Sequence, residues 1–367
     1  MHLEPAEDAG IPKISTQQCN SIEVSSASLP NGKRISLIKT LMTSVCERNC
    51  YYCPFRSERD IRRASFQPDE LAKLFSEIHH SKLADGLFLS SGVVGGGIRS
   101  QDQILATADI LRNKMNYRGY LHLKIMPGVQ KAQVKQAMML ADRLSVNLEA
   151  PNTTYLRQLA PTKQFLNELL QPLQWIEDIR NKQSPHKSWK GRWPSSATQF
   201  VVGGVEESDL ELLATTANLF QQMGIKRVFY SAFTPIIDTP LENRSPTPII
   251  RQHRLYQASY LLRDYGYTLE EMPFDGKGEL PLDMDPKFAW AQRNIIQKPI
   301  EINHAPKKML LRIPGIGPLG AKRIMQTRKK HQLRDLSTLN KMGIHAKKAA
   351  PFILMNGQRP PVQLQLI

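Results

Sequence analysis

The stretch that decides the fold is ISLIKTLMTSVCERNCYYC, residues 35–53. It begins with an apolar run, 35–42, which is typical of a buried parallel strand. A short loop with Cys46, Cys50 and Cys53 follows directly. Thiolate is the usual ligand of iron–sulfur clusters, so each cysteine can bind one corner of a cluster. The three cysteines therefore predict a cluster with one iron left open.

A zinc knuckle is the alternative for these cysteines. A closed zinc site or a closed cluster needs a fourth ligand, which Cys19 or a histidine would have to supply. Cys19 lies 27 residues upstream of Cys46 in a polar segment, and we expect it to be a free thiol. The loop follows the carboxyl end of a strand, where barrels and α/β sheets place their sites, and this favours the cluster.

The strand, loop and helix pattern then repeats along the chain. Further strands are expected at 86–91, 119–126, 143–150, 198–204 and 227–233. Helices are expected at 69–80, 103–115, 129–142, 162–181 and 208–224. Six strands alternating with five helices imply an α/β fold with a parallel sheet. Six units are too few for a closed eight-stranded barrel, so we predict a partial (β/α)6 barrel, with an open doubly wound sheet as the alternative.

The composition divides the chain further. We predict an irregular lead-in over 1–33, the barrel over 34–268, a connecting segment over 269–299, a small all-α module over 300–357 and a tail over 358–367. The net charge of +16 favours polyanionic partners. Clustered cysteines do not fit an extracellular disulfide framework, and no signal peptide or apolar run of membrane-spanning length is visible. We therefore expect a cytoplasmic protein without a membrane partner.

Two expected strands carry polar side chains on one face. Side chains alternate along a strand, so Ser145, Asn147 and Glu149 share a face, as do His122 and Lys124. A polar barrel interior is unfavourable unless it binds something, which suggests a ligand. An internal hydrogen-bond network is the alternative. We expect Lys124 to meet a ligand carboxylate or phosphate, whereas a residue such as His122 is more often a core histidine.

The C-terminal module contains Pro314-Gly315-Ile316-Gly317 between two apolar helical stretches, and a weaker copy at 342–344. This pattern resembles a helix-hairpin-helix motif, whose backbone N–H groups approach a phosphate. From 306 to 367 there are thirteen Lys and Arg residues and one acid, Asp335. Such a charge excess is the footprint of nucleic-acid binding. The expected contacts are Gly315, Ile316, Gly317, Lys322, Arg323, Lys347 and Lys348.

Two alternatives remain open for the basic residues. The C-terminal module could instead serve packing or protein docking. A second basic group follows the cysteines and either extends the nucleic-acid track or forms a solvated loop. It comprises Arg56, Arg59, Arg62 and Arg63.

The C-x3-C-x2-C spacing, with Tyr52 before the last cysteine, resembles the radical S-adenosylmethionine (SAM) superfamily. The resemblance implies a [4Fe–4S] cluster whose open iron binds SAM, an electron donor such as flavodoxin or ferredoxin, and a 5′-deoxyadenosyl radical. Serines replace the usual glycines after the second strand, and no Glu follows them. Residues expected near SAM are Tyr52, Ser90, Ser91, Gly92, Lys124, Ser145, Asn147, Glu149 and Gly203. Candidate catalytic residues are His122, Lys124 and Tyr230.

Over roughly 34–357 the chain is similar to a bacterial and archaeal family described as DNA modification or repair radical SAM proteins. GLFLSSGVV (86–94), GYLHLKIMPG (119–128) and LLRIPGIG (310–317) are among the matching stretches. That family is associated with a uracil-DNA-glycosylase-like protein. The resemblance implies radical chemistry on a flipped-out or single-stranded nucleotide. The alternatives are a radical SAM enzyme acting on tRNA, rRNA or a protein, and a non-enzymatic iron–sulfur protein that binds nucleic acid.

Overall fold

The computed structural model describes residues 24–28 and 34–361. Cys19 and most of the expected lead-in and tail therefore lie outside the described residues. The chain divides into two compact units. The first runs to Glu207 and resumes over Asn218–Gln252, and the second comprises Ser208–Ala217 and the chain from His253 onward. The two units are described separately.

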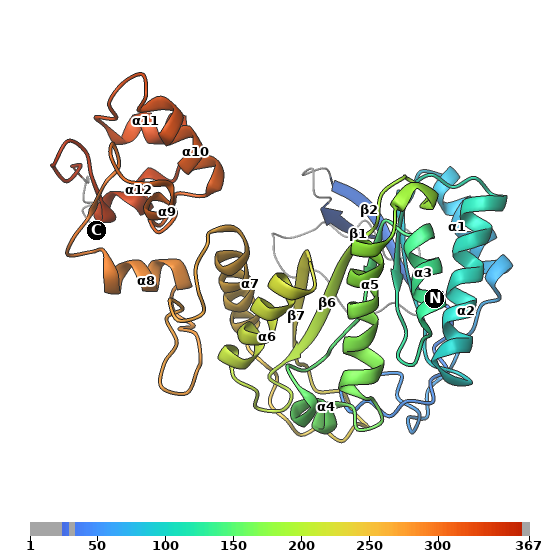
Figure 1. Cartoon of the computed structure of the whole chain (residues 1–367). Helices are drawn as coiled ribbons and strands as arrows, with labels where there is room; N and C mark the ends of the chain where they lie inside the picture. The colour runs from blue at the N-terminus through green and yellow to red at the C-terminus, as the bar shows by residue number, and fades with distance from the viewer. Residues whose placement is uncertain (1–23, 29–33, 362–367) are drawn as a thin grey trace. The chain divides into compact units, whose positions relative to one another are not determined.

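The first unit is built on a seven-stranded sheet (Figure 1). Its strands are β1 (Val24–Ser28), β2 (Arg34–Leu41), β3 (Gly86–Ser90), β4 (Tyr120–Lys124), β5 (Arg143–Ser145), β6 (Ser195–Val202) and β7 (Arg227–Ala232). The strands lie side by side in chain order. Each pair from β2 to β7 is parallel, and β1 pairs antiparallel with β2. The lead-in is thus not wholly irregular, because β1 pairs along the outer edge of β2.

The strand order decides between the two predicted sheets. Crossovers between parallel strands are right-handed, so an order without reversal places every connecting helix on the same face of the sheet. A doubly wound sheet needs a reversal of the order. Helices α1 (Pro68–His80), α2 (Gly96–Asp109), α3 (Lys131–Leu140) and α5 (Gln171–Lys182) contact one another in sequence and lie along one side of the strands (Figure 1). The prediction of an α/β partial barrel is therefore confirmed.

The element bounds differ from the predicted ones at three places. β5 ends at Ser145 rather than at residue 150, because Glu149 has a left-handed backbone with φ +65° that a regular strand does not accommodate. The short helix α4 (Thr153–Leu159) follows, and was not predicted. Two π-helical segments, Ile110–Lys114 and Phe165–Leu170, extend α2 and precede α5.

The second unit includes most of α7 (Ile249–Asp264) and the first half of α6 (Asp209–Gln222). It continues through α8 (Pro286–Asn294), α9 (Lys307–Leu310), α10 (Pro318–Thr327), α11 (Leu336–Lys341), α12 (Ala346–Ala349) and a 3-10 turn, Ala350–Phe352. The segment from α8 onward has its own apolar core, which includes Leu310, Ile324 and Phe352. It is not wholly α-helical, because β8 (Ile300–Glu301) pairs in parallel with β9 (Ile353–Leu354).

Helix α8 lies within the segment predicted as a connection. The sequence at the start of α8 contains a helix-start pattern that the prediction did not use. The Asp285 carboxylate accepts hydrogen bonds from the backbone N–H groups of Lys287 and Phe288, at 2.9 and 3.1 Å, and Pro286 occupies the first helical position. An Asp-Pro pair in this arrangement is a common helix start.

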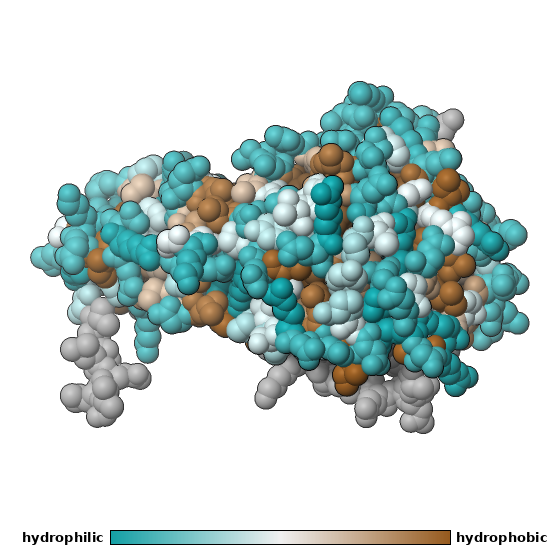
Figure 2. Space-filling model, turned by 90° about the horizontal axis from the view of Figure 1, so that it is seen from below, coloured by the Kyte–Doolittle hydropathy of each residue, from teal (hydrophilic) through white to brown (hydrophobic). Residues whose placement is uncertain are grey.

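The surface drawn in Figure 2 is hydrophilic over most of its area, with apolar residues in small groups. No helix among the described residues is both long enough and apolar enough to span a bilayer.

Candidate functional site

The three cysteines lie on the loop that follows β2, and all three line one pocket at the carboxyl end of the parallel strands. Cys50 is buried, while Cys46 and Cys53 are half-buried. The pocket wall comprises Leu41, Cys46, Arg48, Cys50, Tyr52, Cys53, Pro54, Phe55, Ser91, Gly92, Val93, Lys124, Ile125, Met126, Pro127, Asn147, Glu149, Lys163, Leu169 and Gln199. The loop thus opens onto the ends of several strands at once.

Backbone N–H groups point at two of the sulfurs. The amides of Arg48 and Val93 each donate to Cys46 Sγ at 3.4 Å, and the amide of Phe55 donates to Cys53 Sγ at 3.4 Å. Hydrogen bonds to the sulfurs are one way in which proteins tune an iron–sulfur cluster. The backbone of this loop is therefore arranged to stabilise charged sulfur.

Two of the thiols, Cys50 and Cys53, are not poised to ionise by themselves. Burial is the main cause that raises the pKa of Cys53 to about 12, and burial also raises the pKa of Cys50 although the Lys163 ammonium opposes it. A bound metal reverses this balance, because a coordinating thiol loses its proton outright. The loop therefore requires a cationic group before it can hold three thiolates.

The arrangement of the possible ligand side chains indicates which cationic group the cysteine loop can bind. Among residues 24–28 and 34–361, no set of three or more His, Cys, Asp or Glu side chains is placed to hold a single metal ion. Structural zinc needs four ligands that converge on one point. A four-iron cluster asks only that each thiolate reach a different iron, so Cys46, Cys50 and Cys53 fit the cluster better than the ion. The zinc knuckle completed by Cys19 falls outside the described residues.

Arginines after the cysteines hold the loop in place. Arg63 donates to the carbonyls of Ser44 and Phe55 at 2.7 and 2.8 Å and to two further loop carbonyls. Arg56 is buried and donates to the Asn49 carbonyl at 2.5 Å, while Arg59 donates to a backbone carbonyl of the same loop. These three arginines are neither a nucleic-acid track nor a solvated loop, because each guanidinium donates to acceptors within the cysteine loop, although Arg59 Nε has no partner among the described residues. Arg62 alone remains exposed.

The glycines after β3 let two loops meet. A Cβ built on Gly92 would lie 2.0 Å from the Val45 carbonyl oxygen, so only glycine fits there. The Glu47 carboxylate accepts hydrogen bonds from the amides of Gly95 and Gly96, at 3.0 and 3.2 Å, at the start of α2. These contacts tie the β3–α2 loop to the cysteine loop.

An ion pair between Lys163 and Glu149 lines the same pocket as the cysteines. The Lys163 ammonium lies 3.0 Å from a Glu149 carboxylate oxygen and 3.3 Å from the Tyr52 hydroxyl. Burial by itself would raise the pKa of Glu149, but Lys163 and then Lys124 outweigh it and lower the pKa. Burial opposes the charge on Lys163, whereas the facing Cys50 and Glu149 raise its pKa. The carboxylate and the ammonium are thus both charged beside the cysteines.

Sequence reasoning missed Lys163, because the segment 162–181 is predicted as one continuous helix. Arg48 and Gln199 were missed as well, although both line the pocket. Arg48 pairs with Glu168 at 2.6 Å. No local signal separates these residues from surface lysines, arginines and glutamines.

Two buried polar atoms near the site lack partners. Asn147 Oδ1 and Ser145 Oγ make no hydrogen bond to any residue in the described part of the chain. A buried acceptor left unsatisfied is unfavourable by about 1–3 kcal/mol, and native proteins seldom tolerate it without a ligand or water. Asn147 also lines the pocket, so its free acceptor favours a ligand there over a closed internal network.

Only some of the residues predicted to contact SAM or to act in catalysis line the cysteine pocket. Tyr52, Ser91, Gly92, Lys124, Asn147 and Glu149 line the pocket with the cysteines. The remaining predicted residues, Ser90, His122, Ser145, Gly203 and Tyr230, are not on its wall.

Three of the predicted residues that do not line the cysteine pocket are instead part of the packed interior. His122 packs against Phe88 with ring centroids 4.4 Å apart, and burial lowers the pKa of His122 well below its ordinary value. A Cβ on Gly203 would lie 2.0 Å from the Thr247 hydroxyl, so its role is close packing. Tyr230 is fully buried.

In the second unit, the two predicted hairpins pack on one another. Gly315 and Gly343 both have left-handed backbones, with φ +81° and +70°. Each precedes a buried isoleucine, Ile316 or Ile344. A Cβ on Gly315 would lie 2.6 Å from the His345 carbonyl oxygen, so the first turn contacts the second. The predicted contact at Ile316 is therefore wrong, because its side chain belongs to the core, its backbone N–H donates to the Ile313 carbonyl and its own carbonyl accepts from Lys287.

The basic residues of this unit have different surroundings. Lys322, Lys347 and Lys348 are exposed, and exposed Arg323 donates to the Met342 carbonyl at 2.5 Å. Arg312 is buried and pairs with Glu271 at 2.7 Å. Of the thirteen Lys and Arg residues from 306 onward, eleven are exposed, and only Arg312 and Arg328 are not.

No protein-family model matches the chain, and no curated protein does. Its structure is similar to the FeFe-hydrogenase maturase HydG from Carboxydothermus hydrogenoformans, with 15% identity and a TM-score of 0.48 over 61% of this chain and 50% of that one. It is similar to methylornithine synthase, with 14% identity and a TM-score of 0.46 over 61% of each chain. The radical S-adenosylmethionine methyltransferase TsrM from Kitasatospora setae matches with 9% identity and a TM-score of 0.43, over 79% of this chain and 60% of that one. The chain thus spans about half to three-fifths of each of these structures, and the assignment of the barrel rests on its own strand order.

Proposed function

We propose that this protein is a radical SAM enzyme with a [4Fe–4S] cluster on Cys46, Cys50 and Cys53. The observation that carries the proposal is one loop with three thiols at the carboxyl end of β2, where amides donate to two of the sulfurs. No fourth cysteine, histidine or carboxylate completes a metal site within the described residues. One iron would therefore remain open to SAM.

The residues of the pocket have distinct roles in this proposal. The cluster and SAM together supply one-electron cleavage of the sulfonium. Lys124 and Asn147 offer a cation and a free acceptor for the polar groups of SAM. The Glu149–Lys163 pair holds Tyr52 beside the cysteines, and the apolar wall, with Val93, Ile125 and Leu169, excludes water.

Nucleic acid is the proposed substrate class, with DNA favoured. Two packed turns with left-handed glycines and eleven exposed Lys and Arg residues support it, since such a surface attracts a phosphate backbone. A nucleotide would need to be flipped out or single-stranded to enter a pocket. A flavodoxin or ferredoxin as electron donor, and a uracil-DNA-glycosylase-like protein as partner, complete the proposal. RNA or protein as substrate is the alternative within the same chemistry, and a non-enzymatic iron–sulfur protein is the alternative outside it.

The chemistry is tested by anaerobic reconstitution with iron, sulfide, SAM and reductant. We expect 5′-deoxyadenosine from the parent protein and none from Cys50→Ala. Cys19→Ser is the matched control and should form cluster and product like the parent. Absence of 5′-deoxyadenosine from a fully loaded parent would refute the enzyme. Loss of the cluster in Cys19→Ser would instead favour a four-ligand site.

The substrate class is tested by competition binding of duplex DNA, single-stranded DNA and tRNA at one fixed salt concentration. Lys347→Gln/Lys348→Gln should weaken DNA binding severalfold, because each lost phosphate contact lowers affinity and the salt slope. Lys131→Gln/Lys135→Gln, two exposed lysines of α3, is the charge-matched control. A clear preference for tRNA, or equal losses in both double variants, would contradict the DNA assignment.

A further inference from the structure

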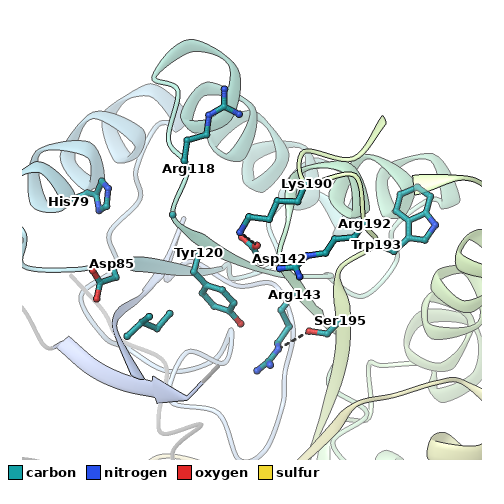
Figure 3. Close-up of a pocket in the computed structure, with 12 residues that line it drawn as sticks. His79, Asp85, Arg118, Tyr120, Asp142, Arg143, Lys190, Arg192, Trp193 and Ser195 are labelled. Atoms are coloured by element: carbon teal, nitrogen blue, oxygen red, sulfur yellow. Dashed lines mark hydrogen bonds and ion pairs between the residues drawn. The ribbon is translucent and has the colours of Figure 1, made fainter. Parts of the chain in front are cut away.

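A second pocket lies at the opposite end of the barrel from the cysteines (Figure 3). It is lined by the first residues of three strands, Tyr120 of β4, Arg143 of β5 and Ser195 of β6. Lys124, at the other end of β4, lines the cysteine pocket. Four residue steps of about 3.3 Å each separate the two positions along the strand, roughly 13 Å. The two pockets are therefore distinct sites.

The pocket has an excess of cations. Four basic side chains line it, Arg118, Arg143, Lys190 and Arg192, against two carboxylates, Asp85 and Asp142. Figure 3 shows Arg192 and Lys190 extending toward Asp142, and Tyr120 and Arg143 pointing in one direction. Arg118 points away from the others in the same view. The cations other than Arg118 that line the pocket are thus Arg143, Lys190 and Arg192.

Both oxygens of the Asp142 carboxylate already accept hydrogen bonds. One of its oxygens accepts from the buried Arg112 guanidinium at 3.0 Å and from the Leu121 amide at 3.0 Å. The other oxygen accepts from Lys190 at 2.5 Å. Arg112 is itself held by three backbone carbonyls and by the face of Trp189, 3.6 Å from the ring centroid. Asp142 therefore cannot also neutralise the remaining arginines.

Two arginines are left without a counter-charge. In the described part of the chain, neither Arg143 nor Arg192 belongs to an ion pair. Arg143 uses only Nε, which donates to the Ser195 hydroxyl at 3.1 Å, so both of its terminal nitrogens remain available. The bond to Ser195 holds the guanidinium between β5 and β6, whose first residues both line the pocket. Guanidinium groups in this state favour the bidentate recognition of a phosphate.

We infer that this pocket is a phosphate-binding site, separate from the cysteine pocket. The ligand is a phosphate ester, bound by the guanidinium groups of Arg143 and Arg192, with Lys190 and the Ser195 and Tyr120 hydroxyls at its edge. The phosphate has two chemical sources, a free nucleotide or other phosphorylated small molecule, and the phosphate of a nucleic-acid strand. The site requires neither cluster nor SAM. Its phosphate binding can therefore be tested whether or not the proposed radical chemistry is correct.

The inference is tested by titration calorimetry of the full-length protein without reconstituted cluster. The probes are inorganic phosphate, adenosine 5′-monophosphate and a short single-stranded oligonucleotide with and without a 5′-phosphate, at constant ionic strength. We expect saturable binding that sulfate competes away. Arg143→Gln/Arg192→Gln should weaken binding at least about tenfold, since two charge-assisted contacts are lost. Arg157→Gln, an exposed arginine of α4 outside the pocket, should bind like the parent.

Each source of phosphate gives its own pattern. Tighter binding of the mononucleotide than of the oligonucleotides supports a free nucleotide, and a gain from the 5′-phosphate on the oligonucleotide supports a strand. If the double variant melts early, Arg192→Gln alone serves, because Arg192 is exposed and its guanidinium makes no hydrogen bond to a described residue. No saturable binding of any probe by the parent would overturn the inference. So would equal affinity of the parent and the pocket variants.

Discussion

The Lys163 ammonium lies 3.0 Å from the Glu149 carboxylate, and both side chains are buried in the wall of the cysteine pocket. Glu149 holds a left-handed backbone to reach this position. Two residues 14 positions apart thus form one charged unit beside the cluster loop, and the unit can be tested by removing either half.

Lys163→Met should lower the free energy of unfolding by about 3–5 kcal/mol, because it leaves the Glu149 charge buried without a partner. Denaturant unfolding of the metal-free protein measures the change. Adding Glu149→Gln to Lys163→Met should recover part of the loss, since the uncompensated charge is then gone. Equal losses in the single and the double variant would show that the pair is not a unit.

Arg63→Gln should loosen the cysteine loop, because Arg63 donates four hydrogen bonds to loop carbonyls. A hydrogen bond from a charged group contributes about 1.5–3 kcal/mol, so the loss of the set should reduce cluster occupancy severalfold. Iron and sulfide content after reconstitution measures it. Arg62→Gln, which alters an exposed neighbour, should load like the parent, and a fully loaded Arg63→Gln variant would contradict the role.

Gly92→Ala should destabilise the first unit by about 1–3 kcal/mol, because the new methyl group would overlap the Val45 carbonyl oxygen. The displaced loop carries Cys46, so cluster content should fall with stability. Thermal unfolding and iron content together check this expectation. Gly276→Ala is the control, since a Cβ there meets nothing within 4 Å and its φ is not positive.

The second unit should become more stable as the pH rises above about 7. Burial lowers the pKa of Lys287 from 10.5 to about 7, and its ammonium donates to the Ile316 carbonyl at 2.6 Å. The unfolded chain therefore binds more protons than the folded chain between these two pKa values, so stability increases with pH in this window. Denaturant unfolding at pH 6.5 and pH 9 measures the slope.

Lys287→Met should flatten that slope, whereas Lys298→Met, an exposed lysine nearby in the chain, should keep it. An unchanged slope in Lys287→Met would assign the pH dependence to another group.

Local pattern was sufficient to predict the alternation of strands and helices and the parallel sheet, whereas the strand order in the structure decided for the partial barrel. Each run of apolar residues and each helix cap acts over a few positions, so the order of strands and helices is visible in the sequence. The loop of Cys46, Cys50 and Cys53 is equally local, because its chemistry needs only the spacing of three thiols. The missed elements are those with weak local signals, such as β1 and the seven-residue helix α4.

The polar faces were predicted only in part. Alternation assigned Ser145, Asn147 and Glu149 to one face, but β5 ends at Ser145. Asn147 and Glu149 still reach the pocket, although from irregular backbone that alternation does not describe. From the sequence alone, Arg63 and Arg56 resemble ordinary surface charges. The oxygen atoms that accept their hydrogen bonds are positioned by the path of the folded loop.

The sequence by itself determined the succession of strands and helices, the cysteine loop and the basic, glycine-rich C-terminal segment, because each follows from short-range periodicity or spacing. Only the tertiary structure decided which residues share a wall. It paired Lys163 with Glu149, closed Gly92 on Val45 and left Arg143 and Arg192 without a counter-charge. Those relationships depend on distances between segments far apart in the chain, and such distances exist only after the strands have been placed side by side.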